Sequence, residues 1–315
     1  MAILISEQDV LELLSPKEAL ECVKQAHIDL ENAQAQNIVR NRARTKSMSL
    51  HTLSAASQSL NSACLKSYTA TRNGTLFHIL YYDAISGELK AIIQAGNLGK
   101  LRTTAASALA ADTLLKPGNY SLGLFGTGFQ AEGIVNAYTK SELGIEISEI
   151  KVSGRNQDKL KEFCKKLSSE KLKLIPCSSE ELCKSSDLIV TATTSSKPVF
   201  SNDDLENVKH ISAIGSNSLA RQEIPARTVT AANLVVVDTI EVAKKEAGDL
   251  LSALENGKLF WNEVAELGEL LTNKKETPKD GFSLFCSQGL AVQDLYCADL
   301  IYNKIKETGG KTIEV

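Results

Sequence analysis

The chain has 315 residues, of which 43% are hydrophobic and 23% are charged, and its formal net charge is -3 at pH 7. These proportions are ordinary for a globular protein and exclude disordered and fibrous classes. The length allows two domains with sizeable cores. A slightly negative chain without a lysine and arginine stripe lacks the field that binds a phosphate backbone, so we expect no nucleic-acid partner.

The seven cysteines are scattered, and none has a Cys-x-x-Cys or Cys/His spacing. This pattern predicts neither a disulfide framework nor a zinc site, and it fits a reducing compartment. The first ten residues carry acids where a signal peptide needs positive charge, and no stretch approaches the 18 apolar residues of a membrane helix. We therefore expect a cytoplasmic protein with no metal and no membrane partner.

The first part of the chain predicts a helix followed by a mostly antiparallel sheet. Ser15, Pro16 and Glu18 combine a hydroxyl N-cap, a first-turn proline and a capping-box acid, which together start a helix. Extended runs then alternate with Asn-Gly and Ser-Gly turns. These runs cover residues 39–54, 63–71, 76–82 and 89–93, and a helix of small residues follows at 103–115.

Three arginines alternate within the first extended run. Arg40, Arg42 and Arg44 recur at period two, so all three would project from one side of a strand. Guanidinium groups gathered on one side favour an anionic ligand.

The second part alternates short apolar runs with helical stretches. Strands are predicted at 121–125, 149–153, 172–175, 188–192, 208–214 and 234–237, with helices at 130–140, 158–168 and 180–184. Such alternation requires right-handed crossovers, so the fold class is α/β with a Rossmann-type, doubly wound parallel sheet. A last helix at 289–306 is long enough to return to the first domain.

A strand runs into Gly-x-Gly-x-x-Ala and then a helix at residues 121–131. Gly126 makes the tight turn, Gly128 lets a pyrophosphate approach the backbone, and Ala131 allows close packing of helix on strand. The helix N-terminus supplies free N–H groups for the phosphates. The turn predicts an NAD(P) site whose residues are Gly126, Thr127, Gly128, Phe129, Gln130 and Ala131.

Residues after two later strands complete the predicted cofactor site. Arg155 and Asn156 stand where an NAD-specific domain usually carries an acid, and an arginine there can hold a 2′-phosphate. NADPH is therefore preferred, with NADH as the alternative if Arg155 is only a solvated loop residue. Small residues at the end of another strand commonly line the cofactor, here Thr191, Ala192 and Thr193.

Several blocks together resemble the ornithine cyclodeaminase and mu-crystallin family over essentially the whole chain. They are the glycine turn and residues 65–68, 81–89, 101–108, 213–217, 246–249 and 287–294, in a specific order and spacing. The resemblance implies a homodimer that acts on amino or imino acids through an imine. It also implies a discontinuous substrate-binding and dimerisation α+β domain, 1–118 together with 290–315, and a Rossmann domain, 119–289.

The resemblance assigns roles to individual residues. Lys66 matches the family's active-site lysine, and Arg102 matches its arginine near the substrate carboxylate and the cofactor. One of Arg40 or Arg42 matches a second carboxylate-binding arginine. The chemistry agrees, because a guanidinium fork fits a carboxylate and a buried lysine can donate a proton. The alternative for Lys66 is an ordinary strand-edge lysine.

Further candidates follow from the same blocks. Thr103, Gly215, Ser216 and Gly289 are implied to bind the cofactor. His51 and His78 lie in strands predicted near Lys66 and could act as acid or base, with His51 binding substrate, or both could be core histidines. Asp294 is implied near the nicotinamide, or it is a structural cap.

The chain departs from the family at Asn217, where cyclodeaminases carry an aspartate. An amide cannot act as a carboxylate base at neutral pH. The departure favours reduction of a cyclic ketimine carboxylate, either pyrroline-2-carboxylate or piperideine-2-carboxylate. The alternatives are dehydration of 3-hydroxyproline in the same site, an alanine-type dehydrogenase, an ornithine cyclodeaminase, and a non-catalytic binding protein like mu-crystallin.

Overall fold

The computed structural model describes residues 1–275 and 281–314. The chain forms two compact units, Met1–Ala105 with Gly289–Val315, and Ala106–Gln288. The first boundary falls within α3 (Gly96–Leu114) rather than after residue 118, where the sequence placed it. Contacts inside the second unit account for this difference, because Ser107 is hydrogen-bonded to Tyr138.

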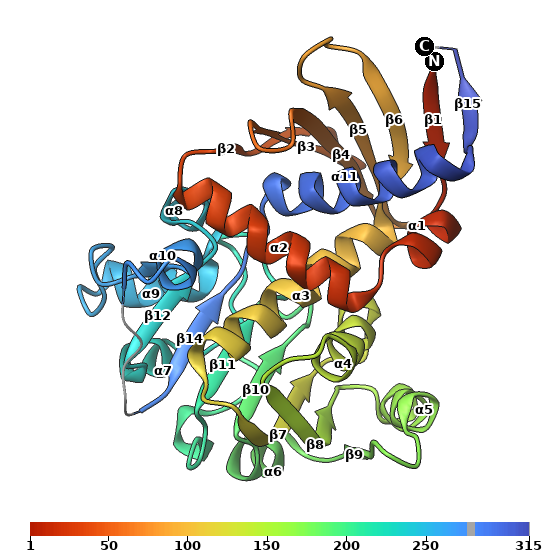
Figure 1. Cartoon of the computed structure of the whole chain (residues 1–315). Helices are drawn as coiled ribbons and strands as arrows, with labels where there is room; N and C mark the ends of the chain where they lie inside the picture. Colours follow the sequence, from red (N-terminus) through yellow and green to blue (C-terminus); the bar gives the residue numbers. More distant parts are fainter. Residues whose placement is uncertain (276–280, 315) are drawn as a thin grey trace. The chain divides into compact units, whose positions relative to one another are not determined.

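The first unit contains a seven-stranded sheet in the order β15-β1-β6-β5-β4-β3-β2 (Figure 1). β1 pairs with β6 in parallel, and the other neighbours are antiparallel, so the predicted mostly antiparallel sheet is confirmed. The strands are β1 (Ala2–Ile5), β2 (Ala35–Arg44), β3 (Met48–Ser57), β4 (Ser62–Thr71), β5 (Gly74–Asp83), β6 (Leu89–Gln94) and β15 (Lys311–Ile313).

The single extended run predicted at 39–54 is in fact two strands, β2 and β3. Thr45 Oγ1 accepts hydrogen bonds from the backbone N–H groups of Ser47 and Met48, which closes a tight turn between them. Such side-chain to backbone bonds are typical of turns. The sequence also missed β1 and β15, which are short and lie near the two chain ends.

Helices α1 (Glu7–Leu13), α2 (Pro16–Glu31) and α11 (Ala291–Thr308) belong to the first unit. α2 begins with the predicted capping box, in which Ser15 Oγ accepts from the Glu18 N–H at 3.3 Å. α11 packs on β3, β4 and α2 (Figure 1).

The N-terminus of α3 is capped by a distant carboxylate. Glu7 accepts hydrogen bonds from the backbone N–H groups of Gly96 at 2.6 Å and Asn97 at 2.7 Å. These N–H groups have no partner inside the helix, and a carboxylate at this end also complements the helix dipole. The cap fixes the start of the helix that carries Arg102.

The second unit contains an eight-stranded, wholly parallel sheet in the order β13-β12-β14-β11-β10-β7-β8-β9. The chain reverses its direction of progress between β7 and β10, which is the switch point where Rossmann folds bind their ligand. The predicted fold class is confirmed. The strands are β7 (Gly118–Phe125), β8 (Ile145–Ser153), β9 (Leu174–Pro176), β10 (Leu188–Thr191), β11 (His210–Ala213), β12 (Leu234–Val237), β13 (Ala265–Glu266) and β14 (Ser283–Cys286).

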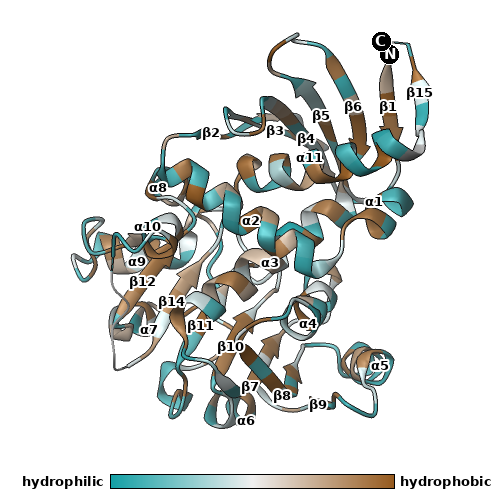
Figure 2. Ribbon diagram, in the orientation of Figure 1, coloured by the Kyte–Doolittle hydropathy of each residue, from teal (hydrophilic) through white to brown (hydrophobic). Residues whose placement is uncertain are grey.

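Helices flank this sheet, and strands such as β12 are hydrophobic throughout (Figure 2), as expected for strands covered on both faces. The helices are α4 (Phe129–Lys140), α5 (Gln157–Leu167), α6 (Ser179–Ser185), α7 (Ala226–Ala231), α8 (Ile240–Glu246), α9 (Gly248–Glu255) and α10 (Leu267–Leu271). The sequence did not predict β14 or the short helices α7 to α10. Among the described residues, no helix is long and apolar enough to cross a membrane.

Candidate active site

Lys66 lies on the helix-covered face of the first unit's sheet. It pairs with Leu53 on β3 and Ile79 on β5, and residues opposite one another point to the same face. Its ammonium group donates to Asp294 Oδ1 at 2.7 Å, and only 2% of the side chain is exposed. β4 has neighbours on both sides, so Lys66 is not at a sheet edge.

Burial lowers the pKa of Lys66 to about 8. The nearby charges of Arg102 and Arg40 lower this pKa as well, whereas the Asp294 carboxylate opposes the shift. A lysine in this range can give up a proton near neutral pH, which an ordinary surface lysine cannot do.

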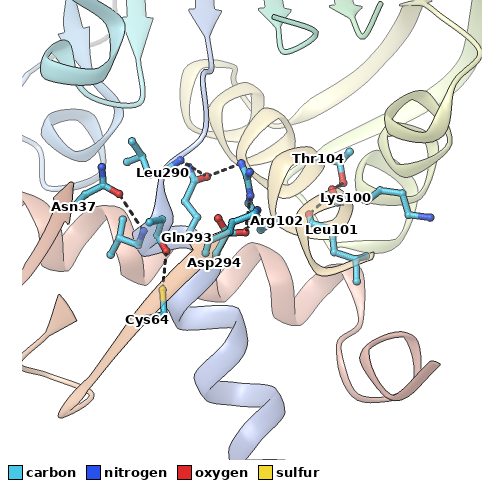
Figure 3. Close-up of polar contacts among 12 residues, drawn as sticks. Asn37, Cys64, Lys100, Leu101, Arg102, Thr104, Leu290, Gln293 and Asp294 are labelled. Atoms are coloured by element: carbon cyan, nitrogen blue, oxygen red, sulfur yellow. Dashed lines mark hydrogen bonds and ion pairs between the residues drawn. The ribbon is translucent and has the colours of Figure 1, made fainter. Parts of the chain in front are cut away.

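Arg102 is held by the beginning of α11 (Figure 3). Its Nε donates to Asp294 Oδ1 at 3.1 Å, and its Nη1 donates to Gln293 Oε1 at 3.2 Å. The amide nitrogen of Gln293 lies 3.0 Å from Nε2 of His27 on α2, which orients the amide. Residues of α11 and α2 therefore hold the guanidinium group that α3 carries. The sequence identified Arg102 and noted Asp294, but it missed Gln293 and His27.

Gly289, predicted to bind the cofactor, packs directly against Arg102. Its φ is +79°, and a Cβ there would lie 2.4 Å from Arg102 Nη1. The backbone conformation favours glycine at this position, and a larger residue would have to move the Arg102 guanidinium.

We expect Gly289→Ala to displace the Arg102 guanidinium and to lower kcat/KM by about 10- to 100-fold, because misplacing a positioning group is costly. Steady-state kinetics of the purified variant would measure this loss. Gly87→Ala is the matched control, since Gly87 has a φ of +75° but a Cβ there meets nothing within 4 Å. Equal effects of the two substitutions would contradict the assigned contact.

The predicted arginine pair joins Lys66 on the same face. Arg40 is buried, with its Cζ 5.9 Å from the ring centre of Tyr68, and Tyr68 follows Lys66 by two residues on β4. Arg42 pairs with His51, whose ring stacks on Tyr68 with 4.3 Å between centroids. A register irregularity in β2 between Ile38 and Asn41 accompanies the burial of Arg40. Arg44, the third arginine of this segment, is exposed.

His51 is half-buried beside these cations. Burial and the charges of Arg42, Arg40 and Arg44 lower the pKa of His51 to about 4, so the ring is neutral at pH 7. Its Nδ1 is buried and has no hydrogen-bond partner among the described residues. A neutral ring next to two guanidinium groups can accept a hydrogen bond, but it does not add positive charge.

His78 lies on β5, the strand next to that of Lys66, as the sequence placed it, but its side chain does not share the face of Lys66. His78 pairs with Ser67, the residue after Lys66, so its side chain points to the opposite face of the sheet and is exposed. Successive residues of a strand alternate between faces, and the face of a residue relative to another strand depends on register. The β4–β5 register could not be derived from the two segments separately.

In the second unit, the glycine turn follows β7 at the switch point. Gly126 has a φ of +118°, and a Cβ there would lie 2.5 Å from the carbonyl oxygen of Ala192. Gly128 is the N-cap of α4, and a Cβ there would meet nothing within 4 Å. Ala131 is fully buried. The tight turn, the open approach to a helix N-terminus and the buried alanine fit a dinucleotide pyrophosphate.

Other predicted cofactor residues surround the same edge of the sheet. Thr191 ends β10, and Thr193 and Gly215 follow β10 and β11. Arg155 is exposed, while Asn156 caps α5 by accepting from the Lys159 N–H at 3.0 Å. Of the other residues predicted to bind the cofactor, Phe129 is exposed and Ser216 is buried. The half-buried residues of this set are Thr103, Thr127, Gln130 and Ala192. Thr103 and Gly289 belong to the first unit.

Glu223 ties these loops together, and the sequence did not single it out. Its Oε1 accepts from the backbone N–H and the hydroxyl of Thr193, at 2.7 and 2.6 Å. Its Oε2 accepts from the Gly215 N–H at 2.8 Å and the Thr191 hydroxyl at 3.1 Å. Burial raises the pKa of this carboxyl group. No local motif surrounds Glu223 that could have indicated these contacts.

The profile of the Ornithine cyclodeaminase/mu-crystallin family matches residues 2–309 of the chain. The chain is 32% identical over 242 residues to the Delta(1)-pyrroline-2-carboxylate reductase of Bacillus thuringiensis subsp. konkukian, covering 75% of this chain and 73% of the relative. It is 29% identical over 226 residues to the ketimine reductase mu-crystallin of Mus musculus, covering 71% and 68%.

Solved structures resemble the chain over nearly its full length. The Delta(1)-pyrroline-2-carboxylate reductase of Thermococcus litoralis, in complex with NADH and L-proline, has a TM-score of 0.92 at 25% identity and covers 99% of this chain and 100% of its own. An archaeal alanine dehydrogenase dimer with bound NAD has a TM-score of 0.91 at 25% identity and covers 99% of each chain.

Proposed function

Because this chain belongs to the Ornithine cyclodeaminase/mu-crystallin family, we propose that it reduces a cyclic ketimine carboxylate with a nicotinamide cofactor. The predicted class, an NAD(P)H-dependent oxidoreductase acting on C=N bonds, is confirmed by the reductases among its relatives. The proposed substrates are pyrroline-2-carboxylate, which gives proline, and piperideine-2-carboxylate, which gives pipecolate. One observation carries the proposal most strongly: buried Lys66, with a pKa of about 8, shares a sheet face with Arg42 and His51.

The residues of the first unit take distinct roles in this reaction. Arg40 and Arg42 bind the substrate carboxylate, for which guanidinium groups have the right geometry. Lys66 donates the proton that the imine nitrogen gains as the C=N bond becomes C–N. Arg102 adds positive charge and holds Asp294. The cofactor, when bound, supplies the hydride to the imine carbon.

The residues of the second unit bind the cofactor in this proposal. The N–H groups at the start of α4 receive the pyrophosphate, and Gly128 leaves room for it. Glu223 holds the loops that carry Thr193 and Gly215.

The direct test is the loss of NADH or NADPH absorbance with each ketimine. We expect turnover of pyrroline-2-carboxylate, piperideine-2-carboxylate or both. No turnover with either ketimine would refute the proposal. Turnover only of pyruvate plus ammonia would indicate an alanine-type dehydrogenase, and reaction of 3-hydroxyproline without added cofactor would indicate a dehydratase. Asn217 disfavours ornithine cyclodeamination.

We propose that the enzyme prefers NADPH because Arg155 follows β8 with an exposed side chain. Arg155→Ala should lower kcat/KM for NADPH by about 10- to 100-fold, the value of a charge-assisted hydrogen bond. The value for NADH should stay within about twofold, because NADH lacks the 2′-phosphate. Lys161→Ala, an exposed cation on α5, is the control. A similar loss with both cofactors would refute this role.

We also propose a homodimer formed through the open face of the first unit's sheet. Ile38 is 53% exposed and lines a cavity of about 310 Å³ together with Leu65, Tyr82 and other residues. Leu76 on β5 is 68% exposed and lies outside the lining of this cavity. Exposed apolar area of this kind commonly marks an interface. The archaeal alanine dehydrogenase whose structure this chain resembles is a dimer.

Light scattering should therefore give twice the mass of the chain. Ile38→Glu should shift the protein toward monomer, since it places a charge in an apolar interface. Leu219→Glu, at a position 41% exposed in the second unit, should leave the mass unchanged. A monomeric wild-type protein, or a dimer unaffected by Ile38→Glu, would contradict the interface.

A further inference from the structure

We infer that Asp294 accepts the N–H group that the ring nitrogen carries once Lys66 has protonated it, and that Asp294 thereby makes the site select nitrogen compounds over oxygen compounds of the same shape. The inference rests on the proposed function, because it concerns the substrate of the same site. It concerns the second oxygen of Asp294, to which neither Lys66 nor Arg102 donates.

The two oxygens of this carboxylate have different surroundings. Lys66 Nζ and Arg102 Nε both donate to Oδ1, at 2.7 and 3.1 Å. Oδ2 is buried and has no hydrogen-bond partner among the described residues. A buried acceptor without a donor costs free energy, and the cost is larger when the group is charged. An N–H donor supplied by the substrate would remove that cost.

The position of Asp294 fits such a donor. The Arg40 guanidinium lies over the Tyr68 ring, and Tyr68 and Lys66 are two residues apart on one face of β4. Residues so spaced are about 7 Å apart along a strand. In a cyclic ketimine carboxylate, the ring nitrogen and the carboxyl carbon are both bonded to the same carbon. A carboxylate near Arg40 therefore places the nitrogen within reach of the Lys66–Asp294 pair.

The charged groups around Asp294 also favour an N–H group of the ligand over an oxygen atom at this position. The cations that surround it come from β2, β4 and α3, namely Arg40, Lys66 and Arg102. A protonated imine or amine would therefore meet repulsion here unless a carboxylate faced it. A ring oxygen or a carbonyl oxygen would instead turn its lone pairs toward Oδ2. A site built around an N–H group discriminates strongly against analogues that lack it.

The first test uses the wild-type protein with cofactor bound and compares two ligands of equal shape. L-Proline carries an N–H donor, and tetrahydrofuran-2-carboxylate carries a ring oxygen at the same place. We expect L-proline to bind about 10- to 100-fold more tightly, as measured by calorimetry. Equal affinities would overturn the inference without any substitution.

The second test uses Asp294→Asn, which keeps the shape of the side chain. The amide NH₂ group, a donor, then takes the place of one of the two carboxylate oxygens, either Oδ1 or Oδ2. The preference for L-proline should fall to within about threefold, and kcat/KM for pyrroline-2-carboxylate should fall by about 100-fold or more. Asp299→Asn is the matched control, since Asp299 lies on the same helix and accepts from the Tyr81 hydroxyl. The Asp299→Asn variant should keep the wild-type preference for L-proline over tetrahydrofuran-2-carboxylate.

The outcomes separate this inference from the proposed function. If the wild type reduces no ketimine but prefers L-proline through Asp294, the proposed reaction fails and the nitrogen selectivity stands. If the wild type reduces ketimines and Asp294→Asn keeps the full preference for L-proline, the reaction stands and the inference fails. Should Asp294→Asn not fold, as circular dichroism would show, the wild-type ligand comparison still decides.

Discussion

Lys66→Met should lower kcat for ketimine reduction by about 10²- to 10⁴-fold, the usual contribution of a positioned proton donor. Methionine fills a similar volume without a proton to donate, and the contact between Arg102 and Asp294 does not involve Lys66. Cofactor affinity should stay within about twofold, because the predicted phosphate-binding residues lie in the second unit. Lys24→Met, at an exposed position of α2, is the control.

The pH dependence gives a separate test of Lys66. Burial lowers its pKa to about 8, so its protonated fraction falls as the pH rises through that value. Below about pH 8, where Lys66 is protonated, the ionisation of Lys66 should leave the kcat/KM of the wild type unchanged. Above that pH, kcat/KM should fall about tenfold per pH unit. The residual activity of Lys66→Met should lack this step. A fall at the same pH in the variant would assign the step to another group.

Glu223→Ala should have the largest effect on the second unit. The carboxylate accepts from the hydroxyl of Thr191, from the backbone and hydroxyl of Thr193, and from the Gly215 N–H. Buried donors that lose their acceptor cost about 1–3 kcal/mol each, so the free energy of unfolding should fall by about 3 kcal/mol or more. Cofactor affinity should fall about tenfold or more, since the loops that follow β10 and β11 lose their common anchor.

Urea unfolding and the fluorescence of bound NADH would measure the two effects of Glu223→Ala. Glu223→Gln keeps one acceptor oxygen and should show an intermediate loss of both. Asp203→Ala removes an exposed carboxylate of the same unit and should change neither. Full stability and full affinity in Glu223→Ala would show that the four hydrogen bonds are not needed.

Local chemistry explains what could be predicted from the sequence. The start of α2 depends on Ser15 and Glu18, which are three residues apart. The glycine turn depends on Gly126 and Gly128, whose roles follow from backbone freedom and close approach. Alternating strands and helices then required a parallel sheet, and the order of the motif blocks indicated the family. Each of these signals lies within a short stretch of chain.

Tertiary structure decided the features that depend on partners distant in sequence. The strand register places His51 on the face of Lys66 and His78 on the other face, and one residue of slip would exchange them. Asp294 meets Lys66 across 228 positions, and Glu223 meets Thr193 across 30. By itself, the sequence determined the glycine turn and the alternation of strands and helices, and it predicted a lysine and arginines as site residues. Only folding decided which carboxylates those groups face, because hydrogen bonds between distant segments leave no periodic signal along the chain.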